Sequence, residues 1–597
     1  MFATSDCSRI RKMVFDLVDF RWDGEIDVQE GEGLTVIACG SRVTVMAESK
    51  PALARAYFRF AQEKTAGKGD FTIHEEKQFA SCGPYLDFSR NGVMTVEACK
   101  RYMHSCAALG MNLLVIYTED TYEIPEYPYM GYLRGRYSQQ ELKELDDYAC
   151  SLGIELVPCI QTLAHLDHFL QWRPQHYMQD QATVLMVDED STYDLIEAMI
   201  RSIRSSISGS RLHIGMDEAH GVGLGNYFYK HGPVDRFQLL KRHLDKVVAI
   251  CEKYGFKPMM WSDMFFRLGS RHDAYYDLEA DIPQSVIDTL PDVGLVYWDY
   301  YHTDEFWYEH MLTQHEKMGD TIFAGGVWTW SGFLPQVDYT WATMEPALKV
   351  CARHKVGTVM ATMWGDDGQE TVHALALSQL PIFSEACWRP DAADRETIVA
   401  TGEFLTGLNR KAYEAFALFY PGAKDRRTGK AVIWCDLLYP LGPDGEELAD
   451  AISRAEQALT MLAPYQDDLR CSYAAALFEV IRQKGPLMRE IRERYQSADK
   501  AWLASAAEKE IPALMEAYRA LRDKHREIWE REFKRNGWEV IALRYGAVLG
   551  RLEDAAFALK RYALGELDAL CELEGKRLSP DRGAQFYRVY TTPAAYL

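Results

Sequence analysis

The fold of this chain is decided by Leu212-His213-Ile214-Gly215-Met216-Asp217-Glu218-Ala219-His220, an apolar run that ends in two adjacent carboxylates. A glycine-rich segment, residues 221–225, follows directly. Strands of a parallel barrel present functional residues at their carboxyl ends, where Asp217 and Glu218 can both turn toward one pocket. Unlike surroundings can then keep one carboxyl group protonated and the other ionised. The alternative is a helix start, where acidic residues are favoured by the helix dipole.

Apolar runs of strand length recur through the middle of the chain. They cover residues 83–88, 112–117, 154–160, 212–216, 258–261, 294–298, 322–328 and 357–364. Amphipathic helices separate them, such as one that opens at the capping box Ser138–Glu141 and closes at Gly153. Eight strand–helix units predict an α/β fold of the TIM (β/α)8 barrel type, with a doubly wound open sheet as the alternative.

The flanks of this region differ from it in pattern. Alternating runs at 34–39 and 41–46, with one helix near 52–62, predict a small α+β domain over residues 1–80. The barrel is expected over 81–395. Helical spacing dominates from residue 396 onward, which predicts a C-terminal α-helical domain over 396–597.

Composition excludes several classes of partner and site. Lys and Arg total 66 against 88 Asp and Glu, and the net charge of -22 argues against nucleic acid and against an anionic membrane surface. The start of the chain lacks a signal-peptide pattern and no long apolar segment follows, so we expect a cytoplasmic protein without membrane insertion. The 13 cysteines form no CxxC pairs, which favours reduced thiols over disulfides or zinc.

The residues that follow the predicted strands share one chemistry. They are Asp87 and Arg90, Glu119 and Asp120, His165, Asp217 and Glu218, Trp261 and Asp263, Trp298 to Tyr300, Trp328 and Trp330, and Trp364 to Asp367. Sugar rings pack their C–H faces on indole, and sugar hydroxyls need carboxylate acceptors and an Arg donor. The predicted site therefore has the composition of a carbohydrate pocket.

Three of these segments resemble glycoside hydrolase family 20, the β-N-acetylhexosaminidases. His213–Glu218 is similar to the family's H-x-G-x-D-E signature, Leu86–Arg90 to its L-D-x-S-R strand, and Trp364–Asp366 to its W-x-E strand. The order and spacing hold from about residue 80 to 395. Within the family, the nearest analogy is to bacterial exo-acting enzymes with an extra C-terminal helical domain.

The resemblance implies substrate-assisted retention without a metal or organic cofactor. Glu218 would protonate the leaving oxygen while the substrate's own acetamido carbonyl attacks the anomeric carbon and forms an oxazolinium. Asp217 would orient the acetamido group and balance the positive charge that develops there.

Other roles carry over by position, each beside a plainer alternative. Arg90 would bind the 3- and 4-hydroxyls, or form a surface salt bridge. Asp120 and His165 match an Asp–His pair that supports the acid, although a lone His is more often structural. Asp366 would accept from the 4- and 6-hydroxyls. The pocket walls would come from Trp261, Trp298, Trp328, Trp330 and Trp364, any one of which could instead belong to the core.

The chain departs from the family pattern at three places. Met216 stands where a second glycine is common, a change expected to alter packing more than chemistry. Asp366 replaces a Glu and reaches one methylene less far. No tyrosine follows the seventh strand to bind the acetamido group, so Tyr300, on the preceding strand end, is the predicted replacement.

The leading hypothesis is therefore an exo-β-N-acetylhexosaminidase that removes terminal GlcNAc, with GalNAc as a second candidate, from oligosaccharides or glycolipids. The alternatives are a sugar-binding barrel without catalysis and a two-carboxylate glycosidase acting on sugars without an acetamido group. The expected partner is a small carbohydrate or glycoconjugate, and a homodimer is a candidate assembly that the sequence does not decide.

Overall fold

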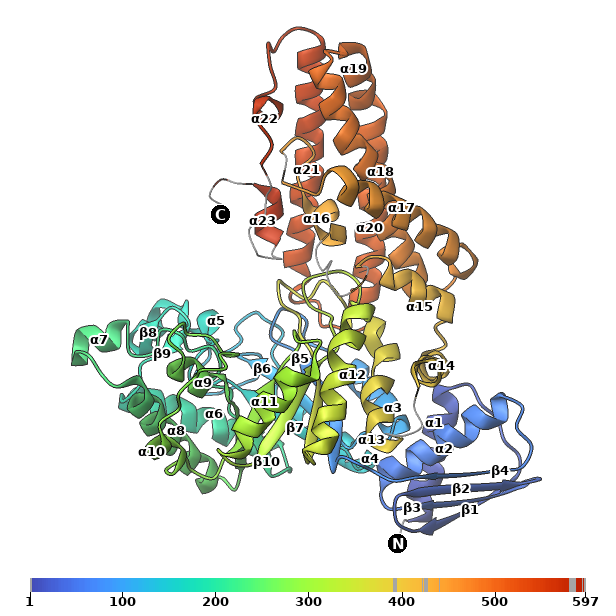
Figure 1. Ribbon diagram of the computed structural model, residues 1–597, viewed down its shortest axis with the longest axis vertical. Coiled ribbons are helices and arrows are strands. Elements are labelled where there is room, and N and C mark those ends of the chain that lie inside the picture. Colours follow the sequence, from blue (N-terminus) through green and yellow to red (C-terminus); the bar gives the residue numbers. More distant parts are fainter. Residues whose placement is uncertain are drawn as a thin grey trace.

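The structure is a computed structural model that describes residues 3–389, 394–420, 422, 428–439, 441–578, 587–592 and 594. Figure 1 shows three parts: a central strand–helix barrel, a small sheet with two helices beside it near the N-terminus, and a bundle of long helices above the barrel. No helix in the described part of the chain is long and apolar enough to cross a membrane.

The N-terminal part is an α+β unit. Its elements are α1 (Thr4–Leu17), β1 (Glu25–Glu30), β2 (Leu34–Cys39), β3 (Arg42–Ala47), α2 (Lys50–Thr65) and β4 (Phe71–Glu75). The strand order is β1-β3-β2-β4, with β1 parallel to β3. The prediction of a single helix here was incomplete. Helix α1 escaped notice because its apolar positions Ile10, Val14 and Phe15 are few and stand among charged residues.

The central part is a closed barrel of parallel strands in the order β10-β11-β12-β13-β14-β5-β6-β7, which confirms the predicted TIM barrel over an open sheet. The strands are β5 (Ser81–Asp87), β6 (Leu113–Glu119), β7 (Glu155–Ile160), β10 (Arg211–His213), β11 (Lys257–Trp261), β12 (Gly294–Trp298), β13 (Thr321–Gly326) and β14 (Thr358–Met363).

Helices surround the barrel, and further short elements decorate its loops. The main helices are α3 (Val96–Ala108), α4 (Gln139–Leu152), α6 (Asp190–Ser206), α8 (Arg236–Lys253), α11 (Glu305–Glu316), α12 (Val337–Arg353) and α13 (Pro381–Trp388). The loop elements are α5 (Asp167–Leu170), η1 (Arg173–Met178), β8 (Gln179–Gln181), β9 (Val184–Leu185), α7 (Asn226–His231), α9 (Asp263–Gly269), α10 (Gln284–Ile287) and η2 (His373–Gln379). Helix α4 has the predicted capping box at Ser138 and Glu141, and Gly153 ends it in the left-handed conformation.

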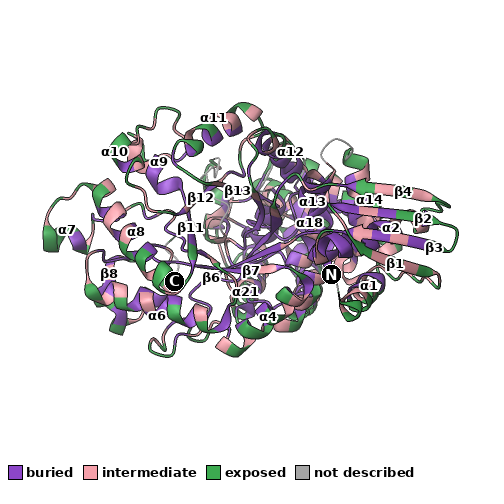
Figure 2. Ribbon diagram, turned by 90° about the horizontal axis from the view of Figure 1, so that it is seen from below, coloured by how far each residue is buried: buried purple, intermediate pink, exposed green. Residues whose placement is uncertain are grey.

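The core divides into a layer inside the barrel and a larger layer between strands and helices. The inside layer includes Tyr85, Tyr117, Val157, Trp261 and Trp364. In Figure 2 buried residues gather along the barrel strands, whereas α7 is largely exposed. The interior is therefore filled, and a ligand can enter only at the strand ends.

The C-terminal part is all helical where it is described. Its helices are α14 (Arg395–Thr406), α15 (Arg410–Ala417), α16 (Thr428–Trp434), α17 (Gly445–Leu462), the short η3 (Ala463–Tyr465), α18 (Leu469–Gln496), α19 (Lys500–Glu508), α20 (Glu510–Glu530), α21 (Trp538–Ala563), α22 (Cys571–Glu574) and α23 (Tyr587–Thr591). Figure 1 places this bundle over one end of the barrel, with the lower ends of α20 and α21 against it.

The N-terminal part is joined to the barrel by a buried ion pair. Arg55 on α2 pairs with Glu75 at 2.6 Å and with Glu385 on α13 at 3.0 Å.

Candidate active site

The segment after β10 turns both acidic side chains into one pocket. The strand ends at His213, earlier than the predicted 212–216, because Gly215 and Met216 have φ of 70° and 72° and Glu218 has φ of 50°. A Cβ on Gly215 would lie 2.1 Å from Gln161 Oε1, so both the conformation and the contact require glycine there. Asp217 and Glu218 lie in a turn well before α7, which excludes the helix-start alternative.

Asp217 is held as a carboxylate from two sides. Its Oδ1 accepts a hydrogen bond from Gln161 Nε2 at 2.7 Å, and its Oδ2 lies 3.2 Å from His165 Nε2. Burial alone would raise the pKa of Asp217, but the charge and hydrogen bond of His165 and the amide of Gln161 lower it to about 2. Asp217 is therefore ionised at neutral pH.

Glu218 faces the same pocket but stays more open to solvent. Its Oε2 lies 3.5 Å from His165 Nε2, and its Oε1 lies 3.6 Å from Arg267. Hydrogen bonding by His165 lowers the pKa of Glu218 against the opposing effects of burial and of Asp217. Buried Asp263 accepts a hydrogen bond from the Glu218 backbone N–H at 3.0 Å and from Arg267 at 3.0 Å, which fixes the turn.

His165 links the two carboxylates. It follows β7 and has φ of 53°. Burial opposes its charged form, but the charge of Asp217 and the hydrogen bonds to Asp217 and Glu218 raise the pKa of His165 well above its ordinary value. An imidazolium that touches both acidic groups is thus part of the site at neutral pH.

Arg90 lies in the same pocket and is oriented by the barrel. Its guanidinium is 3.1 Å from Asp87 and 3.4 Å from Glu119, and it lies over the Trp364 ring at 5.3 Å. Asp87 also accepts a hydrogen bond from the Gly365 backbone N–H at 2.9 Å, which joins the first and last strands. Burial, opposed by Arg90, raises the pKa of nearby Asp366 to about 6.

Aromatic rings form the walls of this pocket. Its lining consists of Arg90, His165, Asp217, Glu218, Trp261, Trp298, Tyr300, Tyr301, Trp330, Trp364 and Asp366. Trp298 stacks on Tyr300 with ring centroids 5.5 Å apart and an angle of 19°. Burial raises the pKa of Tyr300 well above its ordinary value, so its hydroxyl is a neutral donor. Trp261 Nε1 is buried and lacks a hydrogen-bond partner among the described residues, so it can donate to a ligand oxygen.

The pocket brings together all the predicted site residues except Asp120 and Trp328. The expected Asp120–His165 pair is not formed, because Asp120 is buried and pairs with Arg134 at 3.0 Å. Glu119 takes its place, 3.9 Å from His165, since the strand register shifts between Tyr117 and Glu119 and Glu119 has φ of 42°.

Trp328 lies behind the wall instead of lining it. Its Nε1 donates to the Tyr300 backbone carbonyl at 3.0 Å, and its ring stacks on Trp330 at 4.0 Å. The wall itself is therefore made by Trp330, with Trp328 supporting both Trp330 and Tyr300.

Sequence reasoning missed Gln161 and Arg267 as members of the site. Gln161 directly follows β7, so the strand-end rule could have found it. The strand-end rule could not have found Arg267, because this residue lies within α9. Its side chain comes within 3.6 Å of Glu218 because the chain turns directly from β11 into α9.

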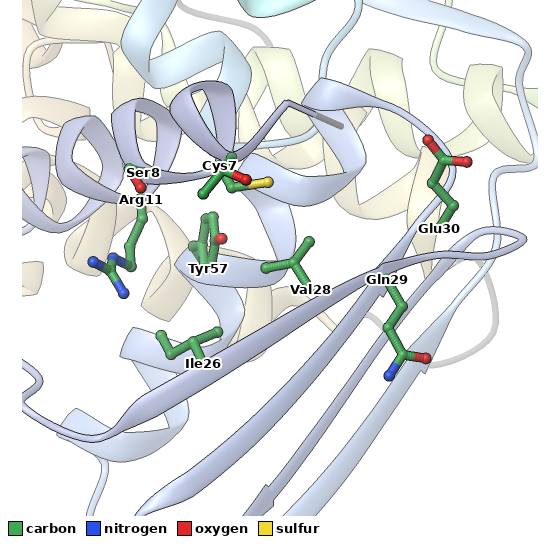
Figure 3. A pocket seen from close by; sticks show the side chains of 9 residues that line it. Cys7, Ser8, Arg11, Ile26, Val28, Gln29, Glu30 and Tyr57 are labelled. Carbon is green, nitrogen blue, oxygen red and sulfur yellow. The ribbon is translucent and has the colours of Figure 1, made fainter. Parts of the chain in front are cut away.

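Other candidate sites in the described residues are weaker. A hollow between α1 and β1, seen in Figure 3, is lined by Tyr57, Ile26, Val28 and Cys7, with Arg11 and Glu30 at its ends. It holds no pair of facing acidic groups. Within the described part of the chain, no group of three or more His, Cys, Asp and Glu side chains is arranged to hold a metal ion.

Two family models match the chain. The catalytic domain of glycosyl hydrolase family 20 matches residues 79–275, and the glycoside hydrolase 20C C-terminal domain matches residues 429–587. The chain belongs to glycoside hydrolase family 20. The catalytic match of this family 20 chain includes Arg90, His165 and the Asp217–Glu218 pair, whereas Asp366 lies beyond it.

Curated relatives of this family 20 chain are distant. Hexosaminidase D of Bos taurus is 27% identical over 210 residues, which cover 32% of this chain and 55% of that protein. A probable beta-hexosaminidase of Arthroderma benhamiae is 24% identical over 297 residues, or 43% of this chain and 48% of that protein. The chain spans about half the length of these curated relatives.

Solved structures share its fold. A chitobiase of Flavobacterium johnsoniae gives a TM-score of 0.53 at 13% identity over 88% of this chain and 93% of that chain. An exo β-N-acetylglucosaminidase of Vibrio harveyi, in complex with N-acetylglucosamine, gives 0.51 at 16% identity over 68% and 73%. At such identities the likeness concerns the fold alone.

Proposed function

We propose that this family 20 chain is a retaining exo-β-N-acetylhexosaminidase. Its substrates would be terminal, non-reducing β-linked GlcNAc residues, with GalNAc as a second candidate, on oligosaccharides or glycolipids. The observation that carries the proposal is the pair of neighbouring acidic groups, one held ionised at a pKa of about 2, that His165 contacts at 3.2 and 3.5 Å.

An Asp217 that is ionised at neutral pH suits substrate assistance. The carboxylate accepts a hydrogen bond from the acetamido N–H and turns the acetamido carbonyl oxygen toward the anomeric carbon. That oxygen forms a bond to the anomeric carbon as the glycosidic bond breaks, and Glu218 gives its proton to the leaving oxygen. The negative charge of Asp217 balances the oxazolinium. Water then attacks the anomeric carbon, Glu218 takes a proton from that water, and the acetamido group is restored.

Glu218 and His165 share the proton that this step needs. Because their oxygen and nitrogen atoms are 3.5 Å apart, a proton held by the pair can reside on either group. Asp217 raises the pKa of His165, so the pair keeps one proton at neutral pH. Turnover uses the form in which that proton is on Glu218.

The remaining pocket residues select the sugar. Arg90, fixed by Asp87 and Glu119, would bind the 3- and 4-hydroxyls through its planar fork. Asp366 would accept from the 4- and 6-hydroxyls. Tyr300 would donate to the acetamido carbonyl oxygen, with Trp298 and Trp330 enclosing the methyl group.

A comparison of 4-nitrophenyl β-GlcNAc with 4-nitrophenyl β-glucoside tests the proposal. Turnover of the first alone, with inhibition by a thiazoline mimic of the oxazolinium in the micromolar range or below, is the expected result. Equal turnover of both glycosides would point to a two-carboxylate glycosidase. Sugar binding without turnover would point to a non-catalytic barrel.

The cytoplasm is the proposed location. All 13 cysteines are free thiols, most of them buried, which supports a reducing compartment. Three further expectations from the sequence remain predictions: the domain borders at residues 80 and 395, the homodimer, and the lack of a nucleic-acid partner.

A further inference from the structure

Two barrel loops carry the residues proposed to bind the sugar hydroxyls, and the helical domain contacts both. Arg90 is followed by Asn91 with φ of 77°, and Asp366 by Asp367, Gly368 and Gln369 with φ of 63°, 96° and 58°. This conformation is uncommon for non-glycine residues, although Asn and Asp adopt it more readily than most. Contacts with the surroundings therefore contribute to where Arg90 and Asp366 point.

On the barrel side, one residue holds both loops. Asp87 accepts hydrogen bonds from the backbone N–H of Arg90 at 3.2 Å and of Gly365 at 2.9 Å. Gln369 closes its own turn by donating to the Gly365 carbonyl at 2.7 Å. These contacts hold the start of the Asp366 loop and close its turn, whereas the carbonyl of Asp367 and the carboxylates of Asp367 and Glu370 are held by other groups.

Those groups come from the helical domain. Arg544 on α21 donates to the Asp367 backbone carbonyl at 2.7 Å and pairs with the carboxylates of Asp367 at 3.1 Å and Glu370 at 2.7 Å. Lys430 on α16, which is fully buried, pairs with Asp367 at 2.5 Å and Glu370 at 2.7 Å. Trp434 Nε1 donates to Glu370 at 2.6 Å. Two cations and two carboxylates thus enclose the segment next to Asp366.

The Arg90 loop meets the same helix. Gly537, the residue before α21, lies against the backbone of Asn91. A Cβ on Gly537 would be 2.2 Å from the Asn91 carbonyl oxygen. Phe533 packs near Gly92, where an added Cβ would be 3.1 Å from its ring. Helix α21 and the segment before it therefore lie against the loops of both Arg90 and Asp366.

We propose that the helical domain positions Asp366, and that Arg544 is the main positioning residue for recognition of the sugar's 4-hydroxyl. This inference rests on the proposed function, since it assumes that Asp366 binds that hydroxyl. The domain would then be part of the specificity of the pocket without contributing a side chain to it. Asp366, shorter than the Glu of the family pattern, depends on the position of its backbone for its reach.

A purely structural role for the same charges makes a different prediction. If Lys430 and Arg544 only join two domains, their loss lowers the unfolding temperature and leaves the selectivity of the folded enzyme unchanged. If Arg544 sets the position of Asp366, the folded variant loses part of its ability to distinguish substrates at C4.

The test uses Arg544→Lys and Arg544→Met in the full chain. Lysine keeps the charge but lacks the fork that binds the Asp367 carbonyl and both carboxylates together. Arg551→Lys and Arg551→Met are matched controls, because Arg551 lies two turns further along α21 and pairs with Asp436 at 2.7 Å, away from the loop. Each variant is assayed with 4-nitrophenyl β-GlcNAc and its 4-deoxy analogue, below its unfolding temperature.

The Arg544 variants should raise KM for the GlcNAc substrate by about 10-fold with little change in kcat, as expected for lost uniform binding. The factor that the 4-hydroxyl supplies is the ratio of kcat/KM for the GlcNAc substrate to kcat/KM for its 4-deoxy analogue. This factor should shrink by about 5-fold or more in the Arg544 variants, whereas the Arg551 variants keep it. Folded Arg544 variants that keep this factor within about 2-fold would overturn the proposal, as would a wild-type enzyme indifferent to the 4-hydroxyl.

Amide hydrogen exchange separates this proposal from the proposed function. Residues 364–370 should exchange faster in the Arg544 variants than in the wild type or the Arg551 variants. Unchanged exchange in that segment would overturn the positioning role, even if activity fell. A wild-type protein without turnover of β-GlcNAc would reject the proposed function, and the exchange measurement would still decide whether Arg544 holds the loop.

Discussion

Replacing Asp217 with Asn removes the charge on which the proposed substrate assistance depends, together with the charge that raises the pKa of His165. Asp217 Oδ1 accepts from Gln161 at 2.7 Å, and an Asn Oδ1 can keep that bond. The Asn amide then takes the place of Oδ2, 3.2 Å from His165. It presents N–H groups to the imidazole and to the acetamido N–H, where the wild type presents an acceptor.

The size of the effect follows from the pKa of Asp217 and from Coulomb's law. Lowering the pKa of Asp217 from 3.8 to about 2 corresponds to about 2 kcal/mol in favour of the ionised form. A carboxylate about 4 Å from an oxazolinium adds roughly 4 kcal/mol at an effective dielectric constant of about 20. Asn loses most of the attraction between the carboxylate and the oxazolinium, so kcat should fall by about 100- to 1000-fold.

The assay is steady-state hydrolysis of 4-nitrophenyl β-GlcNAc, together with binding of the thiazoline mimic and of free GlcNAc. Thiazoline affinity should fall in step with kcat, because that ligand carries the positive charge, and GlcNAc affinity should fall by less than about 10-fold. Asp436→Asn, at a buried aspartate that pairs with Arg551, is the matched control and should leave kcat unchanged. A folded Asp217→Asn enzyme with kcat within about 10-fold of the wild type would refute the mechanism.

Three further variants test the other roles. Glu218→Gln should lower turnover of a glycoside with a poor leaving group by about 100-fold or more and that of an activated aryl glycoside far less, because only the former needs a proton; equal losses would remove Glu218 from the acid role. His165→Asn should move the alkaline limb of the pH profile of kcat/KM toward lower pH, because Asp217 raises the pKa of the proton that His165 shares with Glu218. An unmoved limb would contradict this. By the same linkage, the stability that protonated His165 contributes is fully present below its ordinary pKa of 6.5 and is lost as the pH rises through the folded-state pKa, so unfolding temperatures should converge between wild type and His165→Asn in alkali. Tyr300→Phe should lower kcat about 10- to 1000-fold without loss of stability. Tyr297→Phe removes a hydroxyl that donates to Asp299 and does not line the pocket, and it should leave kcat unchanged. A Tyr300→Phe enzyme with near-normal kcat would assign the acetamido carbonyl to another donor of the pocket.

Local sequence patterns determined the barrel. The apolar runs, the capping box at Ser138 and the glycine at 153 are properties of neighbouring residues, and their alternation leaves few topologies open. Because active sites of parallel barrels lie at the strand ends, the same patterns led to Arg90, Asp217, Glu218 and the tryptophans. The acidic pair needed no tertiary information to be noticed.

Only the tertiary structure decided which strand-end residue faces the pocket. The register shift after Tyr117 and the left-handed backbone of Glu119 turn Glu119 toward His165 and send Asp120 to Arg134. A change of one residue in register reverses which side chain faces inward, and no periodicity in the sequence reports it.

Tertiary contacts also supplied the groups that set the charge of the site. Gln161 and Asp217 are 56 positions apart in the chain, and Arg544 and Asp367 are 177 apart. Such pairs meet because strands close into a barrel and a separate helical domain covers two of its loops. The sequence by itself determined the strands, the residues at their ends and the acidic pair. The protonation and the orientation of those side chains depend on neighbours that only the folded chain brings within hydrogen-bonding distance.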